Sequence, residues 1–210
     1  MRDIPFFQTE NGVASLILKE VAYKKIASIR IQSAMKLDSL LSDCIGFCKA
    51  VGAEHIYAAG HDELRQYPLF TSIIEMSCNK GNIPRLDLKL VPTDTDNYEQ
   101  WRRIYNNAMH DIANAATITL QDVEKHMPGS YFVYNLDELI GIGKITDNRI
   151  DAIASVMKGA GRMTLSALAS LIREENVLVE VASNNVPAMR LYESMGFRII
   201  REISRWYQVL

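Results

Sequence analysis

The sequence predicts an α/β protein with a mixed β-sheet, and three observations lead to this fold class. Apolar stretches of strand length alternate along the chain with segments whose apolar residues recur at helical spacing. The 210 residues are 48% hydrophobic, which is enough to build a substantial core. The order strand, strand, helix, strand, short turn or helix, strand occurs twice, and this repetition predicts two related modules. We expect them at residues 1–80 and 83–210, with the polar segment 79–82 between them.

The first module has the shorter set of predicted elements. Its expected strands and helix are 14–21 (strand), 25–32 (strand), 36–51 (helix), 54–58 (strand) and 70–77 (strand). The helix places Leu37, Leu40 and Leu41 on one face, and Gly52 ends it. The turn that leads into this helix, residues 32–36, contains no glycine.

The second module repeats this order after two additional strands and two helices. The expected elements are 83–91 (strand), 98–109 (helix), 121–126 (short helix), 131–134 and 139–145 (a hairpin), 150–157 (strand), 162–175 (helix), 177–182 (strand), a short helix after Pro187, and 197–209 (strand). Leu165, Leu168 and Ile172 give the helix at 162–175 one core-facing stripe. Gly196 is suited to end the last helix, because glycine adopts the left-handed conformation without strain.

Composition excludes several classes of protein. Lys and Arg total 23 against 25 for Asp and Glu, so the net charge of −2 provides no general attraction to nucleic acid or to an anionic membrane. No apolar stretch has the length of a signal peptide core or a membrane span, and we therefore expect a cytoplasmic protein. The cysteines, Cys44, Cys48 and Cys78, have no metal-binding spacing. We expect buried thiols and no metal.

A glycine-containing loop joins the strand at 150–157 to the helix that follows. Its residues Lys158, Gly159, Gly161 and Arg162 direct backbone N–H groups and positive charge toward one point at a helix N-terminus, which suits a phosphate. The alternative is a tight strand-to-helix turn without a ligand. The P-loop and the dinucleotide fingerprint are excluded, because neither spacing of glycines occurs here.

Two motifs in this region together resemble those of the GNAT superfamily of acyl-CoA-dependent N-acetyltransferases. The first is Lys-Gly-Ala-Gly-Arg-Met at 158–163, where Lys158 stands for the usual Gln or Arg, and Met163 replaces a small residue. The second matches at six positions: Asn185, Ala188, Leu191, Tyr192, Gly196 and Phe197. The resemblance implies a central twisted, mostly antiparallel sheet with splayed middle strands, preceded by a smaller ββαβ-type GNAT-like module.

The resemblance further implies that acetyl-CoA is the co-substrate and enters between the splayed strands. We expect these strands to be 139–145 and 150–157, with the amides of Ser155 and Met157 facing pantetheine and those of the loop facing pyrophosphate. The expected cofactor-binding residues are Ser155, Val156, Met157, Lys158, Gly159, Ala160, Gly161, Arg162, Met163, Asn185, Ala188 and Tyr192. In the first module the matching turn has no glycine, so we expect no CoA there.

The implied reaction is direct attack of a primary amine on the thioester. Tyr192 is the candidate acid for the departing thiolate, and the alternative is that it only packs in the core. The family often has a Glu on the strand where this sequence has Lys144. Asp151 and Glu180 are therefore candidate bases, with structural ion pairs or a water relay as alternatives. Four aromatic residues line the acceptor side or fill the core: Trp101, Tyr105, Tyr131 and Tyr134.

Three functions remain after these observations. The first is an N-acetyltransferase acting on an amine of a small molecule, peptide or protein. The second is a non-catalytic acyl-CoA-binding or sensing protein, and the third is a structural protein in which both modules have lost their ligand. A homodimer is left open. We expect the first module to stabilise the second by covering an edge of its sheet or by shaping the acceptor side.

Overall fold

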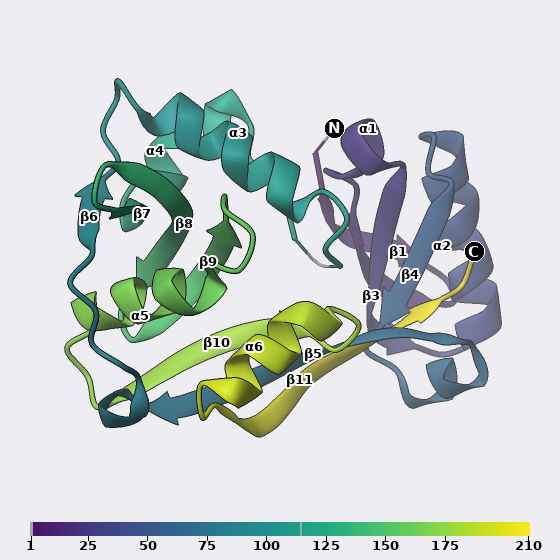
Figure 1. Ribbon diagram of the computed structural model, residues 1–210. Helices are drawn as coiled ribbons and strands as arrows, with labels where there is room; N and C mark the ends of the chain where they lie inside the picture. Colours follow the sequence, from purple (N-terminus) through teal and green to yellow (C-terminus); the bar gives the residue numbers. More distant parts are fainter. Residues whose placement is uncertain (1, 114) are drawn as a thin grey trace. The chain divides into compact units, whose positions relative to one another are not determined.

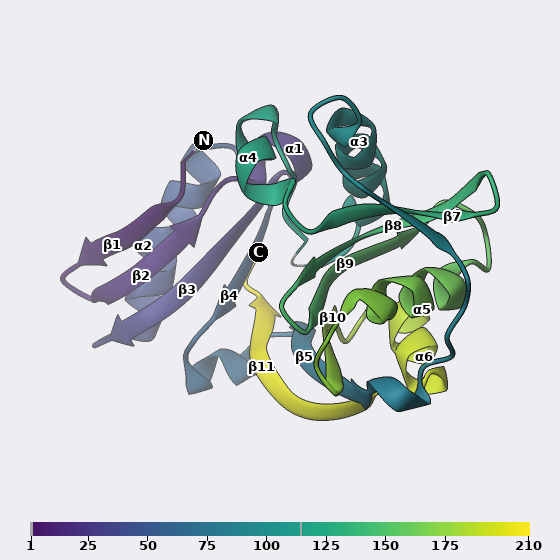
Figure 2. The ribbon, with the colours of Figure 1, turned by 90° about the vertical axis from the view of Figure 1, so that its left-hand side faces the viewer.

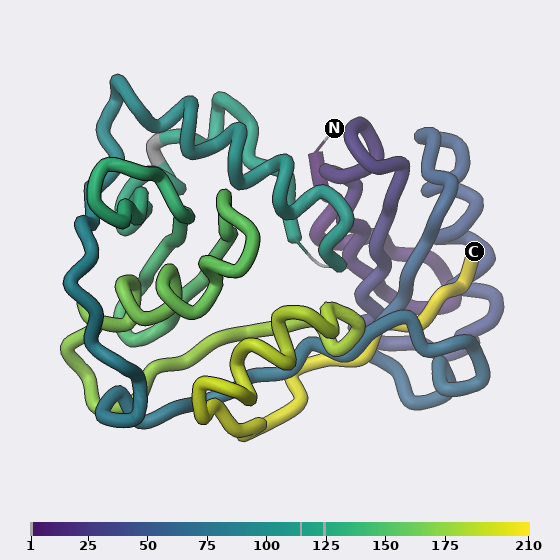
Figure 3. Tube along the Cα trace, in the orientation of Figure 1, coloured from purple at the N-terminus to yellow at the C-terminus, as the bar shows by residue number. Residues whose placement is uncertain are grey.

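The computed structural model describes residues 2–113 and 115–210, and Figures 1 and 3 show the path of the chain. The chain forms two compact units, of which the first contains the residues up to Ile73 together with Ile203–Leu210. The second contains Ile74–Glu202. The predicted α/β class with a mixed sheet is confirmed, since both parallel and antiparallel strand pairs occur.

Unit 1 is a sheet with one long helix packed on it. Its elements are β1 (Ile4–Thr9), β2 (Gly12–Ile17), α1 (Val21–Lys24), β3 (Ile26–Ala34), α2 (Leu37–Ala50), β4 (His55–Ala59) and η1 (Asp62–Gln66). The strand order is β1-β2-β3-β4-β11, where β11 is Arg198–Gln208 near the end of the chain, and β3 and β4 are parallel. The apolar stripe of α2, which includes Leu40 and Cys44, packs on the sheet as its spacing predicts. Strand β1 was not predicted.

Unit 2 contains the larger part of the sheet and four helices. Its elements are η2 (Lys80–Asn82), β6 (Lys89–Pro92), α3 (Tyr98–Met109), η3 (Leu120–Asp122), α4 (Val123–His126), β7 (Ser130–Asn135), β8 (Glu138–Thr146), β9 (Arg149–Ser155), α5 (Gly161–Leu171), β10 (Asn176–Ala182) and α6 (Val186–Ser194). The strand order is β5-β10-β9-β8-β7-β6. The hairpin of β7 and β8 is confirmed. The strand predicted at 83–91 is wrong for its first half, because Pro84 falls within it and the strand begins at Lys89.

The predicted internal repeat is confirmed by the order of the elements. The series β2, β3, α2, β4, η1, β5 in the first half matches β8, β9, α5, β10, α6, β11 in the second. Strands β5 (Leu69–Asn79) and β11 (Arg198–Gln208) each begin in one unit and end in the other. The end of β11 lies beside β4, and β5 lies beside β10. Each half therefore supplies a strand end to the other unit, and the compact units divide inside β5.

Helices cover both faces of the sheet in unit 2, as Figures 1 and 2 show for α3 and α5. Helix α5 packs against β8 at Gly141 and Gly143, where an added Cβ would lie 2.4 Å from Thr164 Oγ1 and 2.2 Å from a Leu168 methyl. The close approach at these glycines is thus made by the helix. On the other face, Trp101 of α3 packs in a second core with residues of β7, β8 and β9.

Two further sequence predictions concern membranes and metals. None of the helices in the described part of the chain combines the length and apolarity that crossing a lipid bilayer requires. Within residues 2–113 and 115–210, no group of three or more His, Cys, Asp or Glu side chains is arranged to hold a metal ion. The three cysteines are buried free thiols, as predicted.

Candidate functional site

The parallel strands β9 and β10 separate over most of their length. In the described residues they pair only where Arg149 and Ile150 lie beside Leu178 and Val179. Strand β9 continues beyond this point to Ser155. The sequence prediction placed the separation between 139–145 and 150–157, and this is wrong.

Strands β8 and β9 instead pair antiparallel from Thr146 opposite Arg149 to Gly141 opposite Ser155. The physical reason is connectivity. A tight turn keeps β8 and β9 together, whereas β9 reaches β10 only through the glycine loop and α5, which leaves the ends of the parallel pair free to diverge.

Two backbone amides share one acceptor just beyond the end of β9. The backbone N–H groups of Val156 and Met157 both donate to the carbonyl oxygen of Ile140, at 2.9 and 3.3 Å. The Met157 amide, expected to face pantetheine, is therefore engaged within the sheet. Because successive amides of a strand point to opposite sides, the amide of Ser155 points toward the side from which β10 has separated. The expectation for Ser155 is consistent with this direction.

The loop that follows leads into α5, whose first amides have no hydrogen-bond acceptor among the described residues. The amide of Ala160 donates to Met157, and that of Thr164 donates to Ala160, which closes the first helical turn. The amides of Gly161, Arg162 and Met163 precede this ladder, so they lie at the positive end of the helix dipole. Of these three amides, those of Gly161 and Arg162 are among the four that the sequence analysis expects to face a phosphate, and their contact with a phosphate stays a prediction.

The two glycines of the loop are needed for different reasons. Gly159 has a φ of +87°, a conformation that other residues adopt only with strain, and an added Cβ would meet no atom within 4 Å. Gly161 has an ordinary φ, but an added Cβ would lie 3.1 Å from a Leu191 methyl carbon and 3.4 Å from Ser155 Oγ. The first glycine thus shapes an open turn, and the second lets α6 pack against the loop.

The two sequence motifs are brought together in space. Leu191 packs against Gly161, and Arg162 Nη2 donates to the Ser194 carbonyl oxygen at 3.3 Å. Lys158 is exposed on the loop. The side chain of Met163, which departs from the GNAT pattern, packs against the core of unit 2. Met163 is partly buried, so a part of this residue stays accessible to solvent at the loop.

The positions of the second motif have structural roles in α6 and at its end. Asn185 caps the helix, because its Oδ1 accepts the amide hydrogen of Ala188 at 3.3 Å. Ala188 packs against the core, and Gly196, with a φ of +88°, follows the helix end as predicted. Their contact with CoA stays a prediction.

Tyr192 is buried, with 5% of its surface exposed. Its ring packs on that of Phe197, with centroids 5.7 Å apart, so the packing role considered from the sequence is present. No hydrogen bond to its hydroxyl is found among the described residues, which leaves the hydroxyl available to a ligand. Burial raises the pKa of Tyr192 to about 12, and the phenol is therefore protonated at neutral pH.

The raised pKa of Tyr192 has a consequence for stability. A phenol whose pKa is higher in the folded than in the unfolded state stabilises the fold fully below pH 10, and this contribution is lost as the pH rises toward 12. Ionisation of this phenol should lower the unfolding free energy of the wild type by roughly 2 kcal/mol as the pH rises toward 12. We expect Tyr192→Phe to lack this decrease, because phenylalanine does not ionise. Urea unfolding of both proteins between pH 9 and pH 12 measures this, and parallel pH curves would contradict it.

Asp151 and Glu180 flank a single arginine at the point where β9 and β10 separate. Arg149 Nε lies 3.0 Å from Asp151 Oδ1, and Arg149 Nη1 lies 2.6 Å from Glu180 Oε1. Thr146 also donates to Asp151, at 2.5 Å. Both carboxylates thus make the ion pairs that the sequence left open as an alternative to catalysis. Burial lowers the pKa of nearby Lys144.

The corresponding region of unit 1 has neither the separated parallel strands nor the glycine turn of unit 2. Strands β3 and β4 pair along the whole of β4, from Ile26 opposite His55 to Arg30 opposite Ala59. Only Met35 and Lys36 connect β3 to α2, and both amides donate to the Asn11 carbonyl oxygen, at 2.8 and 3.2 Å. As in unit 2, two successive amides after the strand share one carbonyl acceptor. The glycine turn and the strand separation, however, are absent from this region of unit 1.

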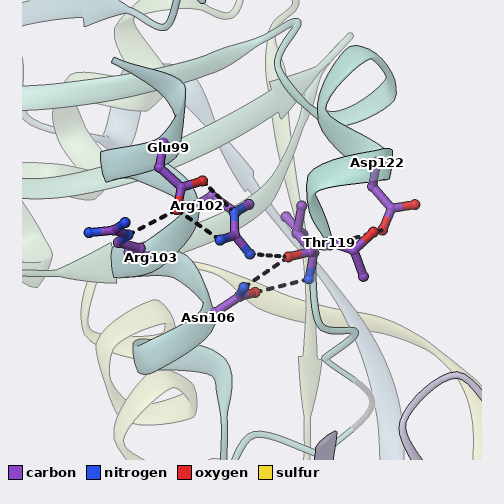
Figure 4. A network of polar contacts seen from close by, with 7 residues as sticks. Glu99, Arg102, Arg103, Asn106, Thr119 and Asp122 are labelled. Carbon is purple, nitrogen blue, oxygen red and sulfur yellow. Dashed lines mark hydrogen bonds and ion pairs between the residues drawn. The ribbon is translucent and has the colours of Figure 1, made fainter. Parts of the chain in front are cut away.

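A polar network fixes the chain that follows α3, as Figure 4 shows. Glu99 accepts two hydrogen bonds from Arg102, at 2.8 and 2.9 Å. Asn106 makes two hydrogen bonds with the backbone of Ile118, both at 2.9 Å. Asp122 and Thr119 form a capping box. The segment at 118–122 is therefore held against α3.

The aromatic residues expected at an acceptor site divide between core and surface. Trp101 is fully buried and stacks between Tyr98 and Tyr105, with ring centroids 5.7 and 5.3 Å away, which supports the core alternative. Tyr131 and Tyr134 are partly buried on β7. The sequence analysis missed Tyr98, whose buried hydroxyl has no hydrogen-bond partner within the described residues.

Comparison with known proteins identifies the fold. No family model and no curated protein matches the sequence. A GCN5-related N-acetyltransferase from Anabaena variabilis matches with a TM-score of 0.62 at 12% identity, over 94% of this chain and 59% of that one. Another from Kribbella flavida matches with a TM-score of 0.57 at 11% identity, over 97% and 89% of the two chains.

A conserved protein of unknown function from Staphylococcus epidermidis matches with a TM-score of 0.61 at 10% identity, over 96% of this chain and 91% of that one. The agreement at such low identities establishes the fold. The chain has the GNAT fold, as the two motifs predicted.

Proposed function

Starting from the GNAT fold, we propose that unit 2 binds acetyl-CoA between β9 and β10 and transfers the acetyl group to a primary amine of a small molecule, peptide or protein. The observation that carries the proposal is the separation of these two strands directly beside the glycine loop. Unit 1 serves as an internal comparison, because its equivalent strands are fully paired and its loop is shorter.

The loop has the chemistry to hold the pyrophosphate. The amides at the start of α5 donate hydrogen bonds, and Lys158 and Arg162 add positive charge at the same helix end. We propose that the outward-pointing amide of Ser155 pairs with the amide-containing pantetheine arm, as a strand edge pairs with another strand. The thioester then lies between β9 and β10.

The proposed reaction is direct acyl transfer. The amine nitrogen attacks the thioester carbonyl, a C–N bond forms, the C–S bond breaks, and CoA leaves as a thiolate that must gain a proton. Tyr192 is protonated at neutral pH and has an available hydroxyl, so we assign it the role of acid. The attacking amine loses its proton to Asp151, to Glu180 or to water.

A charge reversal in the loop tests the binding site. Lys158→Glu combined with Arg162→Glu places two negative charges beside the pyrophosphate and is expected to weaken acetyl-CoA binding about 10- to 100-fold. Isothermal titration calorimetry measures the dissociation constant. The matched control is Lys36→Glu in the short loop of unit 1, which is expected to leave it unchanged. Equal affinity of wild type and double variant would overturn the site.

A non-catalytic acyl-CoA-binding protein is the second candidate, and one observation favours it. Asp151 and Glu180 are both paired with Arg149, so neither is an unengaged base. A panel of primary amines with acetyl-CoA and a thiol-reactive dye separates the two functions. Release of free CoA that depends on an amine supports transfer, and tight binding without such release across the panel supports the sensor.

A further inference from the structure

One face of the sheet in unit 2 carries a row of charged side chains at the point where β9 and β10 separate. Met76 of β5 and Val179 of β10 point into the core that α5 covers. Because side chains alternate along a strand, Glu75 and Glu180 lie on the opposite face. Arg149 of β9 joins them, since its Nη1 lies 2.6 Å from Glu180 Oε1. The row therefore begins beside the opening that we assign to the thioester.

Arg201 of β11, which also belongs to unit 2, extends this row and is held there by Glu75. Its Nε and Nη2 donate to the two carboxylate oxygens of Glu75, at 2.6 and 3.2 Å. The side chain of Arg201 is 65% exposed, whereas that of Glu75 is only 6% exposed. Nη1 makes no hydrogen bond within the described residues, and a guanidinium has five N–H donors. A buried carboxylate thus fixes an exposed guanidinium that keeps donors for a second anion.

The charges of the row act on one another. The hydrogen bond from Arg201 lowers the pKa of Glu75 from its usual value, and the charges of Arg201 and Arg149 add to this lowering. The hydrogen bond to Glu75 and the charges of Glu75 and Glu180 raise the pKa of Arg201. Strand β5 lies between β10 and β11, and neighbouring strands are about 5 Å apart. The guanidinium therefore lies roughly 5 to 10 Å from the opening between β9 and β10.

From the exposed guanidinium and its place beside the opening, we propose that the acceptor is a short amino acid whose carboxylate binds Arg201 and whose amine reaches the thioester. Guanidinium groups bind carboxylates through paired, charge-assisted hydrogen bonds. Glu75 acts as a positioning residue, because it reaches the acceptor only through Arg201. The inference rests on the proposed acyl transfer and narrows its acceptor. The C–N bond still forms at the amine, the C–S bond breaks, and the CoA thiolate gains the proton.

A matched series of acceptors tests the proposal. ω-Amino acids from glycine to 6-aminohexanoate are compared with the alkylamines that lack only the carboxylate, and amine-dependent release of CoA gives kcat/KM for each. At least one amino acid is expected to exceed its alkylamine about 10- to 100-fold. Arg201→Gln is expected to reduce this ratio to about one through a higher KM for the amino acid. Arg201→Lys keeps the charge without the planar fork, so it is expected to retain part of the preference.

Two further variants separate positioning from a general structural effect. Glu75→Gln is expected to lower the same ratio, because the guanidinium is held less firmly, whereas a damaged fold would slow both kinds of acceptor equally. Arg198→Gln removes another exposed arginine of β11 and is the matched control, which is expected to leave the ratio unchanged. Circular dichroism of each variant verifies the fold.

The outcomes distinguish this inference from the proposed function. Equal kcat/KM for amino acids and alkylamines would overturn the acceptor class and leave acyl transfer standing. A preference that Arg201→Gln leaves intact would also overturn it, because the carboxylate would then bind elsewhere. No release of CoA with any member of the series would overturn it as well, and calorimetric titration with acetyl-CoA would then show whether the acyl-CoA site fails too.

Discussion

A fragment comprising residues 80–210 is expected to be unable to fold as a stable domain. The fragment contains every element of the candidate site, but it lacks β5, which lies beside β10 in unit 2. Met76 and Cys78 of β5 are buried in the core of that unit, and Glu75 binds Arg201. Losing large buried side chains costs about 2 to 5 kcal/mol each, which together approaches the whole stability of a typical domain.

The measurement is thermal unfolding followed by circular dichroism. Residues 80–210 are expected to show no cooperative transition, whereas residues 68–210, which retain β5, are expected to show one. This comparison separates the contribution of one strand from that of the rest of unit 1. A cooperative transition of equal midpoint in both fragments would contradict the role assigned to β5. It would also count against the expectation that the first module stabilises the second by covering an edge of its sheet or by shaping the acceptor side.

The sequence predicted the local elements of the second half closely, because their signals are local. The strand that ends at Ser155, the glycine loop and the apolar stripe of α5 follow from residues near one another in the chain. The N-cap at Asn185 and the helix end before Gly196 do so as well. These features depend on backbone preferences and helical spacing, which a single sequence displays.

The arrangement of strands was less accessible, because it depends on which strands are neighbours. The periodicity of β8, β9 and β10 does not reveal that β9 pairs fully with β8 and only briefly with β10. The exchange of strand ends between units leaves no trace in composition. The sequence is enough to place Asp151 and Glu180 on neighbouring strands. It does not show that both carboxylates pair with Arg149, because that depends on how the strands are aligned.

Tyr192→Phe is expected to lower the rate of acyl transfer about 100- to 10,000-fold while leaving acetyl-CoA binding nearly unchanged. The substitution removes one oxygen and keeps the ring, so the packing against Phe197 is retained. Without the hydroxyl, the departing thiolate has no proton donor at this position. The amine-dependent release of CoA measures the rate, and calorimetry measures binding in the same samples.

The control for this substitution is Tyr131→Phe, which removes the phenol hydroxyl of a partly buried residue on β7. A tyrosine that only packs does not need its hydroxyl, so this variant is expected to keep the rate within about 2-fold of wild type.

Because burial raises the pKa of Tyr192 to about 12, its ionisation should not limit the rate at any pH below about 10. A decline of the wild-type rate between pH 8 and pH 9 that persists in Tyr192→Phe would therefore report another group. Full activity of Tyr192→Phe would show that the thiolate gains its proton from solvent, and the buried phenol would then serve packing alone.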